Sequence, residues 1–337
     1  MITLEDDRPV FRFPKVHEEA VCSIGCQRTL RIPDDDRTYP LPPGLGRFPL
    51  RHLDDFAARA PKDWRRRGGV VMPMYQAEAM WLDFDVRALG DYPFAVKVGT
   101  GKIDAVTGEA WVDHLNRDPQ DYLVLPEQPW LDGYCVEKGS IRQFVAMPLG
   151  AGYSAEEQLT GVARWGGLQL VVYPMKAERY RAKVESLRQV VQDMRADKDL
   201  LSILAAPSMG LAAGGRMRQT IHEDPYHLED WDQRHASRCF VTIVNSTAWF
   251  ALSGETPPCR APSAADYASA GLPWFDVYDG DAKALEGAAT LAGLESVAKI
   301  SGRKNDGLVV DEDELPPLRV HKLRSKRRER PVREPNW

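Results

Sequence analysis

The sequence predicts an α+β protein: a β-rich body with a few helices, an extended N-terminal arm and a basic C-terminal tail. Strand-like apolar runs bounded by glycine and proline fill the middle of the chain, from about residue 70 to 172. Helical patterns are fewer and do not alternate regularly with the strands, as they would in a doubly wound parallel sheet. The two ends differ from the middle in composition, which predicts that they extend away from it.

The overall composition indicates a globular protein without membrane segments. Of 337 residues, 43% are hydrophobic and 28% are charged, which is enough apolar material for a core. The longest apolar runs are far shorter than the roughly 20 residues that cross a bilayer. The acidic N-terminus lacks the features of a secretory signal, so we expect a cytoplasmic protein with no membrane partner. The five cysteines are sparse and odd in number, which favours reduced thiols.

Residues 1–48 are predicted to form the extended arm. Pro33, Pro40, Pro42 and Pro43 fix the backbone and remove hydrogen-bond donors, so residues 31–46 cannot form a central strand or a helix. Such a segment can lie on its own body or on a neighbouring subunit, and the sequence leaves both arrangements open.

Residues 49–302 are predicted to form a single β-rich body, with a possible subdivision near 176–200. The clearest strands are expected at 94–98, 122–125, 141–147 and 168–173, each bounded by turn residues. Arg142 interrupts an otherwise apolar run, and we expect its side chain to face solvent. The apolar block 239–252 is predicted to be a further strand.

Helices are expected at three main places in the body. Residues 178–194 carry an apolar stripe at spacings of three and four, which predicts a helix with one buried face. Ser263 and Asp266 have the spacing of a helix N-cap, so a short helix is expected over 263–271. Another short helix is predicted over 281–292, followed by a strand over 294–300.

Residues 303–337 form the predicted charged tail. Between 318 and 334 there are eight Lys or Arg against two Glu, a balance of +6, which leaves −11 for the rest of a chain whose total is −5. A partner of opposite charge is therefore expected to bind this basic segment. The candidate partner-binding residues are Arg324, Lys326, Arg327, Arg328 and Arg330.

A second basic cluster lies at residues 62–67, Lys-Asp-Trp-Arg-Arg-Arg. Arginine makes bidentate contacts with phosphate and tryptophan can stack on bases, so the cluster is compatible with nucleic-acid binding. A solvated loop is the simpler interpretation.

Two glycine-rich stretches resemble phosphate sites in composition. Neither 99–102 nor 209–216 has the spacing of a nucleotide-binding loop. Consecutive glycine amides beside a guanidinium can nevertheless form an anion-binding nest. The candidate anion-binding residues are therefore Gly210, Gly214, Gly215 and Arg216.

The densest polar cluster is 221–235, which holds three of the seven histidines and five carboxylates. His222 and His227 are five residues apart with Pro225 between them, so they cannot share a helix as zinc-protease ligands do. An irregular loop of carboxylates and imidazoles is still compatible with a cation, and the candidate metal ligands are His222, Asp224 and His227.

These features lead to three functional hypotheses. The first is a non-catalytic binding or self-assembling protein, expected to be a homo-oligomer in which the arm and tail contact other copies. The second is a metal-dependent hydrolase with its site in loop 222–235. The third is a nucleic-acid-associated protein that binds through the basic segments, which the acidic remainder of the chain opposes. The sequence identifies no cofactor, no small-molecule ligand and no catalytic residue.

Overall fold

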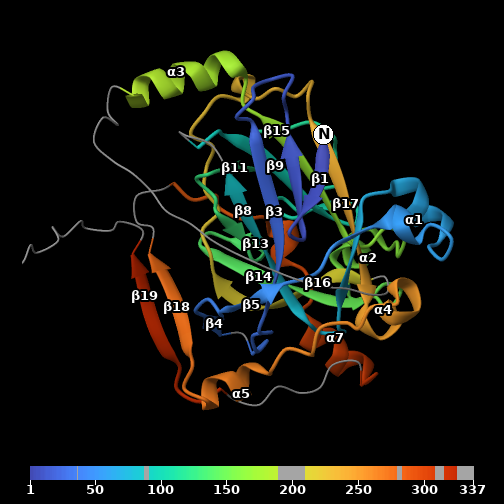
Figure 1. Cartoon of the computed structure of the whole chain (residues 1–337). Helices are drawn as coiled ribbons and strands as arrows, with labels where there is room; N and C mark the ends of the chain where they lie inside the picture. Colours follow the sequence, from blue (N-terminus) through green and yellow to red (C-terminus); the bar gives the residue numbers. More distant parts are fainter. Residues whose placement is uncertain (36, 87–90, 189–208, 279–282, 308–314, 325–337) are drawn as a thin grey trace, which may run out of the picture.

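The computed structural model describes residues 1–35, 37–86, 91–188, 209–278, 283–307 and 315–324. Within them, seventeen strands are joined by hydrogen bonds into one continuous sheet, and two further strands pair separately. The helices are short and lie around this sheet (Figure 1). The protein is therefore β-rich with a few helices, and the predicted α+β class is confirmed.

The continuous sheet consists of two groups of strands that are linked by a single residue pair, Met209 with Ile243. The first group comprises β1 (Ile2–Glu5), β2 (Arg8–Arg12), β3 (Val21–Thr29), β4 (Thr38–Tyr39), β5 (Gly44–Arg47), β8 (Ala79–Val86), β12 (Trp130–Leu131), β13 (Gly133–Glu137), β14 (Ser140–Pro148) and β16 (Met209–Arg218). The second group comprises β6 (Arg51–His52), β7 (Val70–Met74), β9 (Phe94–Thr100), β10 (Ile103–Asp104), β11 (Leu123–Leu125), β15 (Leu168–Pro174) and β17 (Ser237–Asn245).

The two strand groups pack against each other through one hydrophobic core. Ile24 and Phe144 from the first group and Val98 and Leu170 from the second are fully buried members of the same cluster. Burial of this many apolar side chains is the main contribution to stability, at roughly 25 cal/mol per Å² of buried apolar surface. The four predicted body strands correspond to β9, β11, β14 and β15 and are confirmed.

The N-terminal segment is not an arm, and this prediction is corrected. Residues 1–48 supply β1 to β5, and β3 pairs with β8 along eight residues from Cys22 to Thr29. Phe11 and Ile24 are fully buried in the core, so the segment is part of the body. The prolines act only locally, because residues 30–43 hold no strand longer than the two-residue β4 in the part that the structure describes.

The helices lie on the periphery, with α3 at the top and α1 at the right of Figure 1. The helices and 3-10 turns are η1 (Leu53–Phe56), α1 (Lys62–Arg67), α2 (Ala155–Thr160), α3 (Ala177–Arg188), η2 (Leu228–Asp230), α4 (Ser246–Ser253), α5 (Ala264–Ser269), α6 (Ala289–Ala292) and α7 (Val297–Lys304).

Two of the expected helices are found. Helix α3 buries Tyr180 as its apolar stripe predicts, and the remainder of the predicted helix 178–194 lies outside the described residues. Ser263 caps α5 by accepting from the amide of Asp266, so that prediction is confirmed. The strands before and after 176–200, β15 and β16, belong to the same continuous sheet.

Helix caps shorten one predicted strand and replace another: the strand expected over 239–252 is confirmed only to Asn245 as β17, and the strand expected over 294–300 is wrong. β17 stops at Asn245, whose side chain accepts from the amide of Thr247 and begins α4, so the apolar run over 246–252 is helical. Ser296 caps α7 in the same way, over residues predicted to form a strand. The expected helix 281–292 is reduced to α6, with residues 279–282 outside the described part.

Part of the predicted C-terminal tail is also structured. β18 (Pro273–Tyr278) pairs in parallel with β19 (Arg319–Arg324), and the two strands lie side by side at the lower left of Figure 1. Leu41 joins β18 to the body through an antiparallel bridge with Phe275. Residues 319–324 are therefore a strand and not a free tail.

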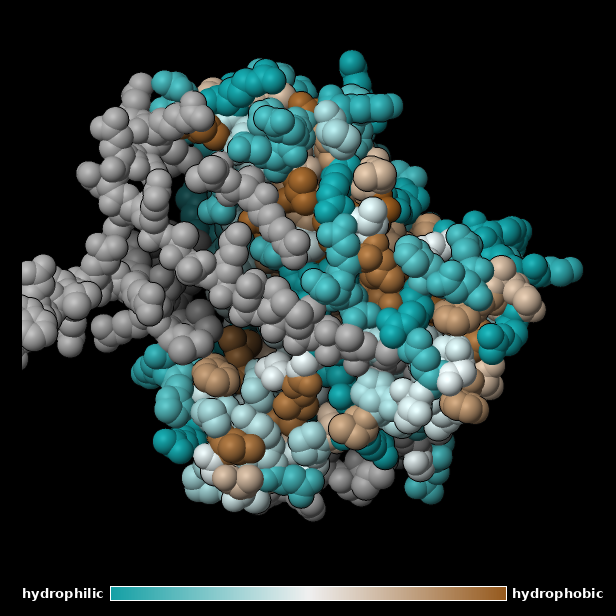
Figure 2. All heavy atoms as spheres, viewed as in Figure 1, coloured by the Kyte–Doolittle hydropathy of each residue, from teal (hydrophilic) through white to brown (hydrophobic). Residues whose placement is uncertain are grey.

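Among the described residues, no helix has the length and apolarity that a membrane span requires. Exposed apolar residues are scattered among hydrophilic ones on the face that Figure 2 shows, and they do not gather into one patch. Such isolated residues are normal on protein surfaces. All five cysteines are free thiols, as predicted, and four of them are buried.

Candidate ligand-binding cavity

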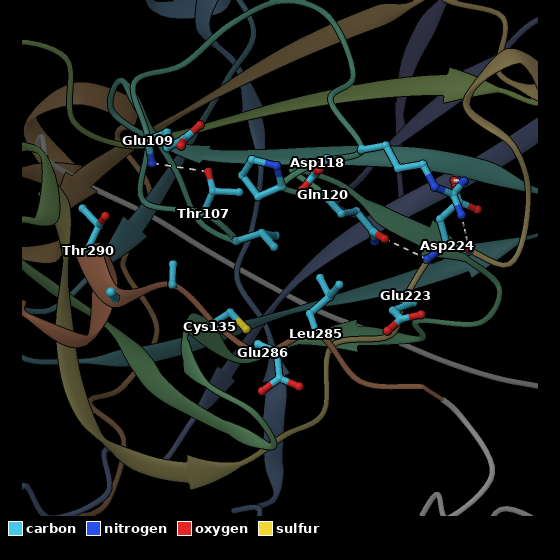
Figure 3. Close-up of a pocket in the computed structure, with 16 residues that line it drawn as sticks. Thr107, Glu109, Asp118, Gln120, Cys135, Glu223, Asp224, Leu285, Glu286 and Thr290 are labelled. Atoms are coloured by element: carbon cyan, nitrogen blue, oxygen red, sulfur yellow. Dashed lines mark hydrogen bonds and ion pairs between the residues drawn. The ribbon is translucent and has the colours of Figure 1, made fainter.

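A cavity with a volume of about 510 Å³ opens where three connecting segments of the described chain meet (Figure 3). Its walls come from residues 106–120, from 223–224 and from 285–290, with Cys135 of β13 between them. Cavities of a few hundred Å³ are the usual size for small-molecule sites. In Figure 3, Thr107 and Gln120 lie on one side of the space, with Cys135 and Leu285 opposite.

One wall is shaped by a turn that folds around Asp104. A carboxylate oxygen, Oδ1, accepts from the amides of Val106 at 2.9 Å and Thr107 at 3.0 Å, and the Thr107 hydroxyl lies 3.3 Å from it. The second oxygen, Oδ2, is buried and accepts from no donor of the described residues. Burial raises the pKa of Asp104 to about 7, although the Thr107 amide opposes that shift. Asp104 thus fixes Thr107 at the cavity wall.

A second wall is held by a buried network around Asp224. Its Oδ2 accepts from the Tyr122 hydroxyl at 2.6 Å and from the Trp231 indole at 3.0 Å, while Oδ1 accepts from the Tyr226 amide. Gln120 bridges to the backbone, since its Oε1 accepts from the Asp224 amide at 2.8 Å. These bonds make the wall a rigid part of the fold.

The rim of the cavity is acidic. Glu109 and Asp118 are exposed lining residues, and neither carboxylate forms an ion pair with the described part of the chain. Glu286 is paired with Lys138, and Glu223 lies 3.8 Å from Lys283. The one lining cation among the described residues, Arg117, is directed at Asp224 and at the Tyr226 carbonyl. Unpaired negative charge therefore faces the opening.

The lining holds few groups suited to catalysis. No histidine lines the cavity among the described residues. Burial raises the pKa of the Cys135 thiol to about 12, so it is not a ready nucleophile. Asp104 has a pKa suited to a general base, but only 2% of its surface is exposed and it is not a lining residue. The arrangement can bind polar or charged groups.

No family model, curated protein or solved structure matches this chain. The geometry and charge of its own residues are therefore the basis for any functional assignment.

The three predicted metal ligands do not form a metal site. In the part of the chain that the structure describes, no three His, Cys, Asp or Glu side chains are grouped to hold a metal ion. Asp224 is turned inward to Tyr122 and Trp231, the His222 ring lies 2.9 Å from the carbonyl of Glu127, and His227 is exposed. Only Asp224 of the three lines the cavity.

The predicted anion nest is also corrected. Gly210, Gly214, Gly215 and Arg216 belong to β16, and the two consecutive glycines form a bulge opposite Gln143 of β14. A nest requires alternating right- and left-handed backbone, and neither Gly214 nor Gly215 has a positive φ. A Cβ on Gly215 would collide with the carbonyl of Pro33, so close backbone contact explains this glycine. Arg216 pairs with Glu137 instead.

The predicted partner-binding residues lie almost entirely outside the described part of the chain. This is the case for Lys326, Arg327, Arg328 and Arg330, whereas Arg324 is the last residue of β19. Their role stays a prediction.

Sequence reasoning found Asp224 but missed the rest of the cavity. The signal that could have revealed it is the stretch Asp104-Ala-Val-Thr-Gly108, in which an Asp precedes a Thr by three residues and a Gly follows. Asp and Thr at this spacing often form side-chain to backbone turns. Gly108 completes the turn with a φ of +71° and lies against Leu291.

Proposed function

We propose that the protein is a non-catalytic binding protein whose cavity takes a small cationic molecule. The supporting observation is the unpaired charge of Glu109 and Asp118 at the opening of a cavity of about 510 Å³. Hydroxyl and amide groups of Thr107, Gln120 and Thr290 add hydrogen-bonding partners, and Leu285 and Ala288 supply apolar wall. An ammonium or guanidinium group fits this combination.

Calorimetric titration with the diamine putrescine and with agmatine tests the proposal directly. We expect saturable binding of these cations, and no binding of butanediol or succinate, which match them in length but not in charge. The double variant Glu109→Gln with Asp118→Asn removes the two unpaired charges, and we expect it to weaken binding at least ~10-fold. At a free ligand concentration of about 100 times the Kd, binding should also raise the free energy of unfolding by about 2.7 kcal/mol.

A matched control neutralises two exposed carboxylates elsewhere, Glu18→Gln with Glu185→Gln. It should bind the cations as the natural protein does. If both double variants lose cation binding equally, or if succinate binds as tightly as the cations, the rim carboxylates do not select the ligand.

No observation on the described residues favours the metal-dependent hydrolase. Self-assembly, the other part of the sequence-based hypothesis, stays a prediction. The N-terminal segment is folded into its own body, so it no longer needs another copy to pack against. Sedimentation velocity of the full chain and of a chain ending at residue 324, at low and high salt, tests it. A monomer in all four conditions contradicts it.

A further inference from the structure

Three cations surround one tryptophan on the surface of the second strand group. The Arg164 guanidinium carbon lies 4.7 Å from the ring centre of Trp165, the Lys102 Nζ 5.5 Å and the Arg67 guanidinium carbon 5.9 Å. Cations at such distances are attracted to the face of an indole ring. We call Trp165, Arg67, Lys102 and Arg164 the Trp165 platform.

The platform is assembled from separate parts of the chain. Arg67 ends α1 and donates from Nη1 to the carbonyl of Trp165 at 2.7 Å. Lys102 lies between β9 and β10, and Arg164 and Trp165 lie in the loop between α2 and β15. The end of α1 thus places Arg67, the last residue of the basic cluster noted in the sequence, against an aromatic ring 98 residues away.

The loop that carries Trp165 is held rigidly from below. Glu156, which is 2% exposed, accepts on Oε2 from the amides of Trp165 at 3.2 Å and Gly166 at 2.9 Å. Gly101, with a φ of +59°, lets the backbone lie directly against this carboxylate. A ring fixed through its own backbone presents a preorganised surface to a ligand, which lowers the entropy cost of binding.

Within the part of the chain that the structure describes, direct ion pairs do not balance the charges of the platform cations. Among the described residues, Arg67, Lys102 and Arg164 form no ion pair with a carboxylate. Burial lowers the pKa of Arg67, and the negative charges of Asp63 and Glu156 oppose that shift. Three like charges around one ring repel one another, so an external anion would stabilise the arrangement.

The surroundings extend the same chemistry. The backbone amide of Trp111 donates to the Lys102 carbonyl at 2.9 Å, and Trp111 lies over Gly99, where a Cβ would approach its ring to 2.6 Å. Lys62 and Arg65 of α1 are exposed and also form no ion pair in the described part. Beneath Trp165, a cavity of about 40 Å³ is lined by Gln169, whose buried Oε1 accepts from no described donor. An unpartnered acceptor, aromatic rings and unpaired cations thus occur together.

We propose that the Trp165 platform binds single-stranded nucleic acid, with a base stacked on Trp165 and phosphates on Arg67, Lys102 and Arg164. Unpaired bases stack on tryptophan without regard to sequence, and a basic surface follows the backbone. A duplex offers phosphates but no free base faces. The site is separate from the acidic cavity and does not depend on the function proposed for it.

Fluorescence anisotropy of a labelled dT12 oligonucleotide at about 50 mM salt tests the assignment. We expect Trp165→Ala to weaken binding about 10-fold, and Trp165→Phe to retain most of it. The double variant Lys102→Glu with Arg164→Glu should weaken binding more than ~10-fold, and it should lower the dependence of log K on log salt by about 0.7 for each lost phosphate contact. A thermal melt of each variant confirms that it is folded.

The matched control is Lys15→Glu with Arg181→Glu, two exposed cations that form no ion pair with the described residues. Phe13 packs against Phe94, the first residue of β9, and Tyr180 is linked to Phe94 through Tyr92. Lys15 and Arg181 are therefore near the start of β9, about 20 Å from Lys102, which follows the other end of that strand. It should bind dT12 normally.

Four results would overturn the proposal. The first is that the natural protein does not bind dT12. The second is that duplex DNA or heparin binds as tightly as dT12 and Trp165→Ala does not weaken that binding. The third is that the control variant loses as much binding as the platform variant. Thymidine monophosphate bound as tightly as dT12 would assign the platform to free nucleotides and so also overturn the single-strand assignment.

Discussion

The cavity and the Trp165 platform are neighbours in sequence and opposites in charge. Lys102 belongs to the platform, whereas Thr107 and Glu109, only a few residues later, line the cavity. The turn around Asp104 reverses the chain between them, so one short segment serves two surfaces. The net charge of −5 therefore says little about either surface, because the charges are segregated by the fold.

The two sites also differ in how they are supported. The cavity depends on buried carboxylates, Asp104 and Asp224, that hold turns in place. The platform depends on Glu156, which fixes a loop through backbone amides. Substituting each carboxylate in turn tests these supports one at a time. We expect the change in stability to be largest at Asp224, intermediate at Asp104 and smallest at Glu156.

Asp224→Ala should have the largest effect. It leaves the Tyr122 hydroxyl, the Trp231 indole and the Tyr226 amide without their acceptor, and each lost buried bond costs about 1–3 kcal/mol. We expect the free energy of unfolding to fall by about 4 kcal/mol in urea denaturation, whereas Tyr122→Phe removes a single donor and should cost only about 1 kcal/mol. A loss for Asp224→Ala no larger than that for Tyr122→Phe would mean that the network does not support the wall.

Asp104→Asn should change how stability depends on pH. Folding raises the pKa of Asp104 from 3.8 to about 7, so the folded protein keeps a proton that the unfolded chain releases. The stability from that proton is fully present below about pH 4 and is lost as the pH rises to about 7, at roughly 1 kcal/mol per pH unit. The variant, always neutral, should be more stable than the natural protein above that pH and should have a flatter profile.

Denaturation at about pH 5, 6, 7 and 8 measures this difference. The exposed Asp54→Asn serves as control and should follow the natural profile. Parallel profiles for Asp104→Asn and the natural protein would show that Asp104 is ionised throughout.

Glu156→Ala should have the smallest effect on stability, about 1 kcal/mol, because Glu156 accepts from two loop amides, one of them only partly buried, whereas Asp224 accepts from three donors. Although the loss of stability is small, the variant should bind dT12 clearly more weakly, since the Trp165 ring loses its fixed position. Glu156→Gln keeps an acceptor oxygen and should restore binding. If Glu156→Ala binds dT12 normally, the ring does not need this support.

The local pattern of the sequence predicted the elements whose structure depends on near neighbours. The strands β9, β11, β14 and β15, the buried face of α3 and the Ser263 cap of α5 all follow from residues within one or two turns. The prediction for block 239–252 failed at Asn245, because the apolar run continues across a helix cap and hides the change of period.

The tertiary structure alone decided the long-range arrangements. Arg142, expected in solvent, is buried and lies 3.3 Å from Asp34, a partner 108 residues away that no local pattern reveals. The N-terminal segment looked extended because of its prolines, yet β3 pairs with β8 across about fifty residues or more of chain. Arg67 contacts Trp165, a residue 98 positions away in the sequence. Periodicity and capping act between neighbours in the chain, whereas the cavity and the platform are made by contacts between segments that pairing and burial bring together.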